Sequence, residues 1–223
     1  MTESIVIQQP PGQAQQLVLL FHGLGETPQA MLALGERLAR QFPNAFVVSV
    51  VAAEPADGGT GHQWLSVRGL DDANRTARVS AALPAFLRAV AHWQAVSGLG
   101  PVATALIGFS QGAIMALEAT RVEAACAGRV VAIAGRFTEL PERAAPATTL
   151  HLFHGKQDEV IPYRHTIEAV QHLLGIGGDA TADVLPFVGH TLVDDFVDLT
   201  IERLTGYVPK RLWDEAMRSA GAS

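Results

Sequence analysis

The sequence predicts an α/β fold in which a mostly parallel central sheet is flanked by helices. Short runs rich in β-branched residues alternate with longer stretches of helical pattern, as expected when each strand is followed by a helix that crosses back over the sheet. Several of the short runs are almost continuously apolar, which is typical of strands covered on both faces. The chain has 223 residues and is 48% hydrophobic, and we predict a single domain over residues 1–223.

The strands are predicted from these apolar runs. Six of them should form the parallel part of the sheet: residues 17–21, 46–51, 104–107, 130–134, 149–153 and 182–187. Residues 5–8 are predicted as an antiparallel edge strand. Only about 14 residues separate the strand that ends near Ala134 from the one that begins near Thr148, which is too few for a cap domain. We therefore expect an open, shallow site.

Helices are predicted between the strands. The first, at 28–41, has Thr27 as its N-cap and Pro28 at its first position. A long helix at 72–96 should be kinked or divided by Pro84. The remaining main helices are predicted at 111–123, 163–174 and 191–204.

Two segments outside this alternation carry separate predictions. Residues 206–223 form a C-terminal extension, in which 209–219 is predicted as a short amphipathic helix that packs on the body of the domain. The loop 54–63 contains three glycines and is expected to be flexible. Because it follows a strand, it should lie at the carboxyl edge of the sheet, where such folds bind ligands.

Composition excludes several classes of function. The formal charge of -6 argues against a nucleic-acid partner or attraction to anionic lipid. No apolar run reaches the length of a membrane span, so we expect no stable membrane insertion, and no signal peptide is visible. The single Cys126 fits a reducing compartment, which predicts a cytoplasmic location. No glycine-framed turn surrounds this thiol in the run 123–127, and we interpret it as structural or incidental rather than as a nucleophile.

The strongest chemical signal is the run Gly-Phe-Ser-Gln-Gly at 108–112. It follows a predicted strand and precedes a predicted helix, which is the context of a nucleophile elbow. Ser110 would occupy a tight, strained turn, and Gly108 and Gly112 would remove the side chains that clash there. The alternative is a serine that caps a helix. We predict Ser110 as the nucleophile.

A nucleophilic serine requires donors for the oxyanion that forms on the carbonyl oxygen. The backbone N–H of Gln111 lies at the start of the elbow helix and is predicted as one donor. The second should come from the run His-Gly-Leu-Gly at 22–25, which follows an early strand, and we assign it to Leu24. His22 could instead be the base, but its place at a strand end beside this turn favours a structural role.

The serine also requires a base and an acid that orients the base. In this type of fold the chain order is serine, then acid, then histidine. Asp158 follows the predicted strand 149–153, and His190 follows the predicted strand 182–187, so both should lie at the carboxyl edge beside Ser110. We predict His190 as base and Asp158 as acid. If the last strand were misplaced, Asp183, Asp194 or Asp195 could replace Asp158.

No metal site is predicted. His151 and His154 have a suggestive spacing, but on a strand their side chains point to opposite faces. His165 and His172 fall in a helix and are expected at the surface. Apolar side chains on loops near the carboxyl edge are candidates for an acyl pocket, although each could equally be core; they are Trp64, Leu65, Phe137 and Ile161.

Taken together, the motifs at 22–25, 108–112, 154–158 and 189–190 resemble the phospholipase/carboxylesterase family of α/β-hydrolases, which also contains the acyl-protein thioesterases. The likeness is greatest to small bacterial carboxylesterases and extends over nearly the whole chain. It implies the α/β-hydrolase fold, the same catalytic residues and oxyanion donors, and no cofactor. Thioesterase-like members carry an aspartate where this chain has Ser66, so their substrate preference is not transferable.

The sequence therefore predicts a serine esterase that hydrolyses short- to medium-chain carboxylic esters through an acyl-serine intermediate. A lysophospholipase or acyl-thioesterase with the same three residues is the alternative. A ligand-binding protein without turnover is a more distant one, because such proteins usually lose a catalytic residue. A dienelactone-hydrolase-like enzyme would carry a cysteine in place of Ser110. The expected partner is a small ester or thioester, and a homodimer is left open.

Overall fold

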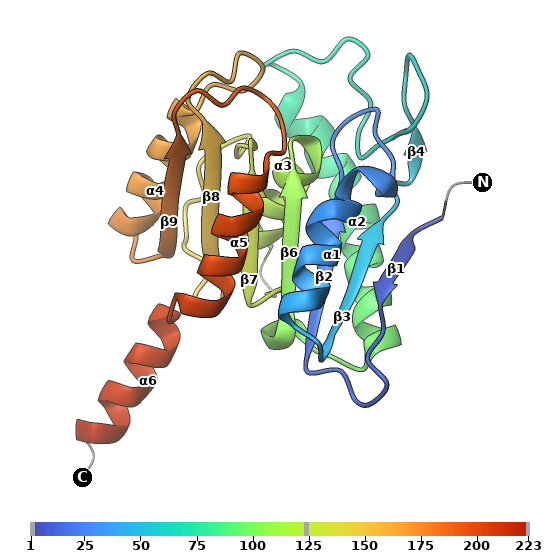
Figure 1. Cartoon of the computed structure of the whole chain (residues 1–223). Coiled ribbons are helices and arrows are strands. Elements are labelled where there is room, and N and C mark those ends of the chain that lie inside the picture. The colour runs from blue at the N-terminus through green and yellow to red at the C-terminus, as the bar shows by residue number, and fades with distance from the viewer. Residues whose placement is uncertain (1–2, 123–124, 222–223) are drawn as a thin grey trace.

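A seven-stranded sheet forms the centre of the computed structural model, which describes residues 3–122 and 125–221. Its strand order is β1-β3-β2-β6-β7-β8-β9 (Figure 1). Only β1 runs antiparallel to its neighbour, and the other neighbouring pairs are parallel. The strands are β1 (Ile5–Gln8), β2 (Gln16–Phe21), β3 (Ala45–Val50), β6 (Thr104–Phe109), β7 (Arg129–Ile133), β8 (Thr149–Gly155) and β9 (Asp179–Leu185). The predicted fold class, with its antiparallel edge strand, is confirmed.

Helices cover both faces of the sheet. In Figure 1, α1 and α5 lie on the near face, and α2 and α3 lie behind it. The α-helices are α1 (Leu32–Gln41), α2 (Arg75–Ser97), α3 (Gln111–Glu118), α4 (Arg164–Gly175), α5 (Asp194–Gly206) and α6 (Lys210–Gly221). Short 3-10 helices are η1 (Pro28–Met31), η2 (Pro101–Ala103) and η3 (Ala119–Arg121).

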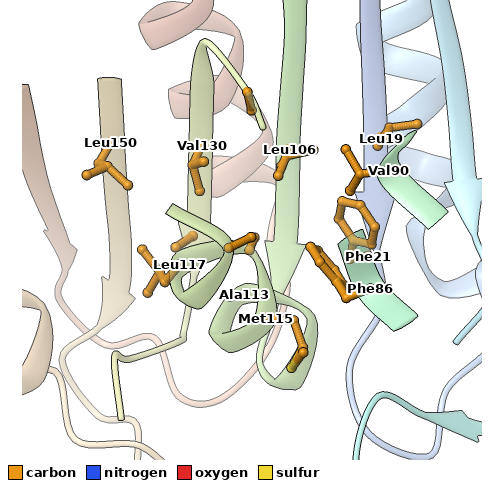
Figure 2. Close-up of a cluster of buried hydrophobic side chains, with 14 of the residues drawn as sticks. Leu19, Phe21, Phe86, Val90, Leu106, Ala113, Met115, Leu117, Val130 and Leu150 are labelled. Carbon is orange, nitrogen blue, oxygen red and sulfur yellow. The ribbon is translucent and has the colours of Figure 1, made fainter. Parts of the chain in front are cut away.

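Alternating side chains of each strand feed two cores. Leu19 and Phe21 of β2 pack with Phe86 of α2 in one core, part of which is drawn in Figure 2. Val18 and Leu20 point to the other face, against α1 and α5. Because both faces of β2 are covered, its sequence is apolar almost throughout, which explains why the strands were visible as continuous apolar runs.

Several helix predictions need correction at their ends. Residues 28–31 form the 3-10 helix η1, and Thr27 precedes it without a side-chain capping bond. Pro84 lies inside α2 without dividing it. Since Pro84 is exposed and Phe86 is buried in the core, packing holds the helix together through the proline. The third helix, predicted to Glu123, ends as an α-helix at Glu118 and continues as the 3-10 helix η3 to Arg121, and Glu123 itself lies outside the described residues.

The last strand and the glycine-rich loop also differ from prediction. Strand β9 begins at Asp179 and ends at Leu185, so it starts three residues before the predicted 182, and Phe187 lies beyond it with a positive φ of 61°. The loop 54–63 contains a short antiparallel pair, β4 (Glu54–Pro55) with β5 (His62–Gln63). This hairpin is tied to the loop after β2 by an additional bridge between Glu26 and His62.

Helix α6 does not pack on the body, contrary to our prediction. It extends away from the sheet (Figure 1), and its large apolar side chains Leu212, Trp213 and Met217 are exposed. Its first turn is attached to the body, where the N–H of Lys210 donates to Asp179 Oδ2 at 2.9 Å and Arg211 Nη1 donates to the carbonyl oxygen of Gly128 at 3.4 Å. Because these polar contacts hold the start of the helix and the rest points away, its apolar face stays uncovered. None of the helices in the described part of the chain combines the length and apolar character of a membrane span.

Candidate active site

Three polar side chains meet at the carboxyl edge of the sheet. Ser110 follows β6, Asp158 follows β8 and His190 follows β9, and these strands are parallel, so their ends lie at one edge. Ser110 Oγ lies 2.8 Å from His190 Nε2, and His190 Nδ1 lies 2.7 Å from Asp158 Oδ2. With the ring proton on Nδ1 donated to the carboxylate, Nε2 is left to accept the serine proton. The structure thus brings together the three residues that the sequence singled out.

The backbone at Ser110 is strained. Its φ of 51° and ψ of -116° place a side chain where L-residues rarely occur. A Cβ on Gly112 would lie 2.3 Å from the carbonyl oxygen of Phe21, and one on Gly108 would lie 2.5 Å from the backbone of the following helix. The two glycines therefore permit the close approach of strand and helix, as predicted, and the turn presents Ser110 at the sheet edge.

The Asp158 carboxylate is held by backbone N–H groups as well as by the His190 ring. Its Oδ1 accepts hydrogen bonds from the backbone N–H groups of Val160 and Ile161 at 2.9 and 2.8 Å. The side chain has no exposed surface, and these donors offset the cost of burying its charge. A fixed carboxylate of this kind sets the orientation of the His190 ring.

His154 is a residue of this site that sequence reasoning did not find. Its Nε2 lies 2.7 Å from the carbonyl oxygen of Ile161 and 3.2 Å from Asp158 Oδ2, and its Nδ1 lies 2.8 Å from the hydroxyl of Thr166. Burial lowers the pKa of His154, so the neutral ring donates from Nε2. The signal was the four-residue spacing between His154 and Asp158.

The backbone N–H groups of Leu24 and Gln111 lie at the cavity beside Ser110, and neither has a hydrogen-bond partner within the described residues. The neighbouring N–H of Gly23 is occupied by the carboxylate of Glu26 at 2.7 Å, and that of Gly25 binds the carbonyl oxygen of His62 at 2.9 Å. The loop is therefore fixed on both sides of Leu24 while its own donor stays free. Such a pair is suited to hold an oxyanion.

His22 has a different environment. Its side chain is fully buried; Nδ1 lies 2.8 Å from the carbonyl oxygen of Gly23 and Nε2 accepts the N–H of Ala52 at 3.2 Å. Burial lowers its pKa, and both ring nitrogens are used by backbone groups. The structural interpretation of His22 agrees with this geometry.

The Gln111 side chain has a structural role that the motif did not reveal. Its Oε1 accepts the N–H of Trp64 at 2.6 Å, and its Nε2 donates to the carbonyl oxygen of Leu65 at 2.9 Å. Trp64 in turn donates its ring N–H to the carbonyl oxygen of His22 at 2.8 Å. The elbow, the loop after β2 and the loop after β5 are thereby joined.

A cavity of about 170 Å³ opens beside Ser110. Leu24, Leu65, Gln111 and Ile161 line it, together with other apolar side chains and two arginines. Trp64 and Phe137, which we also expected here, are not among its lining residues. Trp64 packs against Phe21 and Phe86 in the core, and Phe137 is likewise buried in that core.

The remaining candidates are engaged elsewhere. Asp183 pairs with Arg203 at 2.6 Å, and Asp194 and Asp195 lie in the first turn of α5. His151 contacts Arg129 and Thr181. The described residues contain no group of three or more potential metal ligands. Burial raises the pKa of Cys126 to about 11, so its thiol stays protonated at neutral pH.

Two further histidines are less exposed than we expected. His165 and His172 of α4 are half-buried rather than at the surface. His165 Nε2 lies 3.3 Å from Arg136 Nη1, and His172 Nε2 lies 2.8 Å from the carbonyl oxygen of Pro141. Both therefore contact neighbouring loops.

The parallel sheet and the elbow at its carboxyl edge are those of an α/β-hydrolase. A model of the phospholipase/carboxylesterase family matches residues 2–205, and the chain belongs to this family. The resemblance noted from its motifs is thus confirmed. The protein is a hydrolase, an esterase of the phospholipase/carboxylesterase family.

Its relatives agree with this assignment. Esterase YpfH of Escherichia coli (strain K12) is 46% identical over 215 residues, which cover 96% of this chain and 93% of the relative. Acyl-protein thioesterase 1 of Kluyveromyces lactis is 28% identical over 177 residues, covering 70% of this chain and 75% of the relative. The crystal structure of esterase PE8 superposes with a TM-score of 0.80 at 28% identity, covering 93% of this chain and 99% of that one.

Proposed function

We propose that the protein hydrolyses carboxylic esters with short- to medium-chain acyl groups through an acyl-serine intermediate. The observation that carries the proposal is the continuous hydrogen-bonded chain from Ser110 through His190 to Asp158. Ser110 acts as nucleophile, His190 as general base and acid, and Asp158 as the carboxylate that orients the ring.

The reaction proceeds in two halves. His190 Nε2 takes the proton of Ser110 Oγ as this oxygen bonds to the ester carbonyl carbon. The backbone N–H groups of Leu24 and Gln111 bind the oxyanion of the tetrahedral intermediate. His190 then gives its proton to the departing alcohol oxygen, and the acyl group remains on Ser110. In the second half, water attacks the acyl-serine with the same proton transfers, and the acid is released.

The size of the cavity supports a short acyl group. The cavity has a volume of about 170 Å³ and a largely apolar lining. A long fatty-acyl chain needs considerably more room than this, whereas a few methylenes fit against the apolar lining.

Hydrolysis of thioesters or lysophospholipids with the same three residues is the second candidate. The relationship to acyl-protein thioesterase 1 of Kluyveromyces lactis supports it. Ser66 argues against copying that specificity, because its hydroxyl donates to Asp57 at 2.7 Å, a bond that a carboxylate at this position could not donate. This bond also lowers the pKa of Asp57 to about 2.

The domain organisation, the cellular location and the oligomeric state remain predictions. We propose one domain over residues 1–223, supported by the single seven-stranded sheet. A cytoplasmic location is supported by the single cysteine. A homodimer is a further prediction, for which gel filtration is the test.

The test is hydrolysis of 4-nitrophenyl esters from acetate to palmitate by the wild type and Ser110→Ala. We expect turnover that is fastest with short chains and is lost in Ser110→Ala, with an unchanged circular dichroism spectrum. Preference for palmitate would favour the second candidate. Equal activity in Ser110→Ala, or no activity of the folded wild type on any ester, would overturn the proposal.

A further inference from the structure

One wall of the cavity beside Ser110 is charged. Arg75, the first residue of α2, and Arg136, just after β7, line it together with Ser110. Much of the remaining lining is apolar, including Leu65, Leu70 and Val79. An esterase for plain alkyl esters requires no cation at this place. We propose that Arg75 and Arg136 bind a carboxylate of the substrate, so that the preferred substrates are carboxylate-bearing esters; this inference rests on the proposed function.

The positive charges of the Arg75 and Arg136 guanidinium groups are not fully neutralised by nearby carboxylates. Arg75 Nη2 and Arg136 Nη2 lie 3.1 and 3.6 Å from the same oxygen, Oδ1 of Asp72. The Asp72 side chain is 90% exposed, so water screens its charge strongly. Two cations thus share one well-hydrated carboxylate, and a net positive charge remains at the cavity wall.

Both arginines also keep hydrogen-bonding capacity. The Nε–H of Arg75 is buried and has no hydrogen-bond partner among the described residues. Arg136 donates from Nη1 to the His165 ring at 3.3 Å, which leaves further N–H groups of its planar fork. A guanidinium fork matches a carboxylate with two parallel hydrogen bonds. A carboxylate bound here would therefore satisfy donors that the protein leaves unused.

Comparison with a structural arginine supports this interpretation. Arg129 donates to the backbone carbonyl oxygens of Arg203 and Tyr207 at 3.1 and 2.9 Å, and so joins α5 to the sheet. The guanidinium groups of Arg75 and Arg136 donate to no backbone carbonyl oxygen within the described part of the chain. Their contacts are limited to one exposed carboxylate and one ring, which holds them at the cavity without using them to join elements.

The burial of Arg136 and its positively charged neighbour also favour an anion in the cavity. Burial and the neighbouring Arg75 lower the pKa of Arg136, which means that its cation is disfavoured as the cavity stands. An anion in the cavity would relieve this cost. The chain as a whole carries a formal charge of -6, so a local positive charge at the cavity favours the entry of a carboxylate.

The experiment compares charged and neutral esters of matched length. On the acyl side, the pair is mono-4-nitrophenyl glutarate and 4-nitrophenyl pentanoate; on the alcohol side, it is 3-carboxyphenyl butyrate and phenyl butyrate. kcat/KM is measured for the wild type, Arg75→Gln, Arg136→Gln and Arg136→Lys. Arg88→Gln is the matched control, because Arg88 is exposed on the same helix.

We expect the wild type to prefer the charged member of at least one pair by about tenfold or more, as for a charge-assisted hydrogen bond. The preferred pair shows on which side of the ester the carboxylate lies. Arg75→Gln and Arg136→Gln should lose this preference mainly through KM, Arg136→Lys should keep part of it, and Arg88→Gln should keep all of it. Turnover of the neutral member should change little in Arg88→Gln, whose side chain lies outside the cavity.

Equal kcat/KM for both members of both pairs, or a preference that persists in Arg75→Gln and Arg136→Gln, overturns the inference. If these variants do not fold, inhibition of the wild type decides: glutarate should inhibit neutral-ester hydrolysis at least about tenfold better than glutaramide, and equal inhibition overturns the inference. Ser110-dependent turnover without a charge preference refutes only this inference. Turnover of both members by Ser110→Ala, or of neither by the wild type, refutes the proposed function itself.

Discussion

Two histidines follow strands at the same edge of the sheet, His22 after β2 and His190 after β9, yet their surroundings differ. His22 has no exposed surface, and both of its ring nitrogens bond to backbone groups. The His190 side chain is 17% exposed, with a carboxylate on Nδ1 and a hydroxyl on Nε2. A position at the carboxyl edge is therefore not sufficient for a base. What distinguishes the two is the partner of Nε2, which is the hydroxyl of Ser110 for His190 and the backbone N–H of Ala52 for His22.

The comparison also explains why both histidines matter. The His22 ring fixes the loop that presents the unpaired N–H of Leu24, through bonds to Gly23 and Ala52. His190 would move protons at Ser110. We therefore expect loss of His190 to affect kcat and loss of His22 to affect mainly stability.

His190→Ala should produce the largest effect. Without a base, the serine hydroxyl is a weak nucleophile, and kcat on 4-nitrophenyl acetate should fall by at least about 1000-fold. The thermal midpoint should change by less than about 4 °C, because this side chain is partly exposed. Retention of more than a tenth of wild-type kcat in a folded variant would assign the base elsewhere.

His22→Ala should destabilise the fold by about 1–3 kcal/mol, because the N–H of Ala52 loses its buried partner. Urea unfolding measures this value, and kcat/KM of the folded variant should remain within about tenfold of wild type. Complete loss of activity with normal stability would give His22 a chemical role and break the distinction between the two histidines.

The free energy of unfolding should decrease as the pH falls below 6.5. Burial lowers the pKa of His22, His154 and His151, the last to about 3 from an ordinary value of 6.5. Below pH 6.5 the unfolded chain thus binds more protons than the folded one. Each such histidine removes about 1.4 kcal/mol per pH unit until its folded pKa is reached.

Urea unfolding at pH 7.5, 6 and 5 measures this slope. His151→Gln should reduce it, whereas His92→Gln should not, because His92 is exposed. A stability that stays flat or rises toward pH 5 contradicts the neutral state assigned to these rings.

Removal of residues 212–223 should have the smallest effect. Helix α6 extends away from the sheet edge that carries Ser110 (Figure 1), so kcat/KM should change by less than about twofold, well under 1 kcal/mol. Gel filtration of both forms would show whether the exposed Trp213 and Met217 join two copies. A tenfold loss of activity would mean that this helix reaches the site.

Sequence reasoning found what depends on local pattern. The elbow at 108–112 was visible because strand, glycines and helix adjoin in the chain, and chain order then led to Asp158 and His190. The start of β9 was missed because Asp179 and Thr181 interrupt the apolar pattern of this edge strand. The amphipathic pattern of α6 shows that an apolar face exists but not what covers it.

Contacts between residues that are distant in the chain could not be predicted from the sequence. Trp64 and Phe137 were expected at the cavity, but large aromatic side chains near a sheet edge can equally fill the core, and both do. His154 and Gln111 hold their neighbours through hydrogen bonds to loops distant in the chain. Arg75 and Arg136 lie 61 positions apart, and only the folded sheet brings them to one wall.

The most direct test of the central claim, that Ser110 is an activated nucleophile, is covalent labelling with a fluorophosphonate followed by mass spectrometry of the peptides. The hydrogen-bonded chain from Ser110 to Asp158 predicts stoichiometric labelling of the wild type at Ser110, slow labelling of His190→Ala and none of Ser110→Ala. Labelling at another serine, or no labelling of an esterase-active wild type, would contradict it.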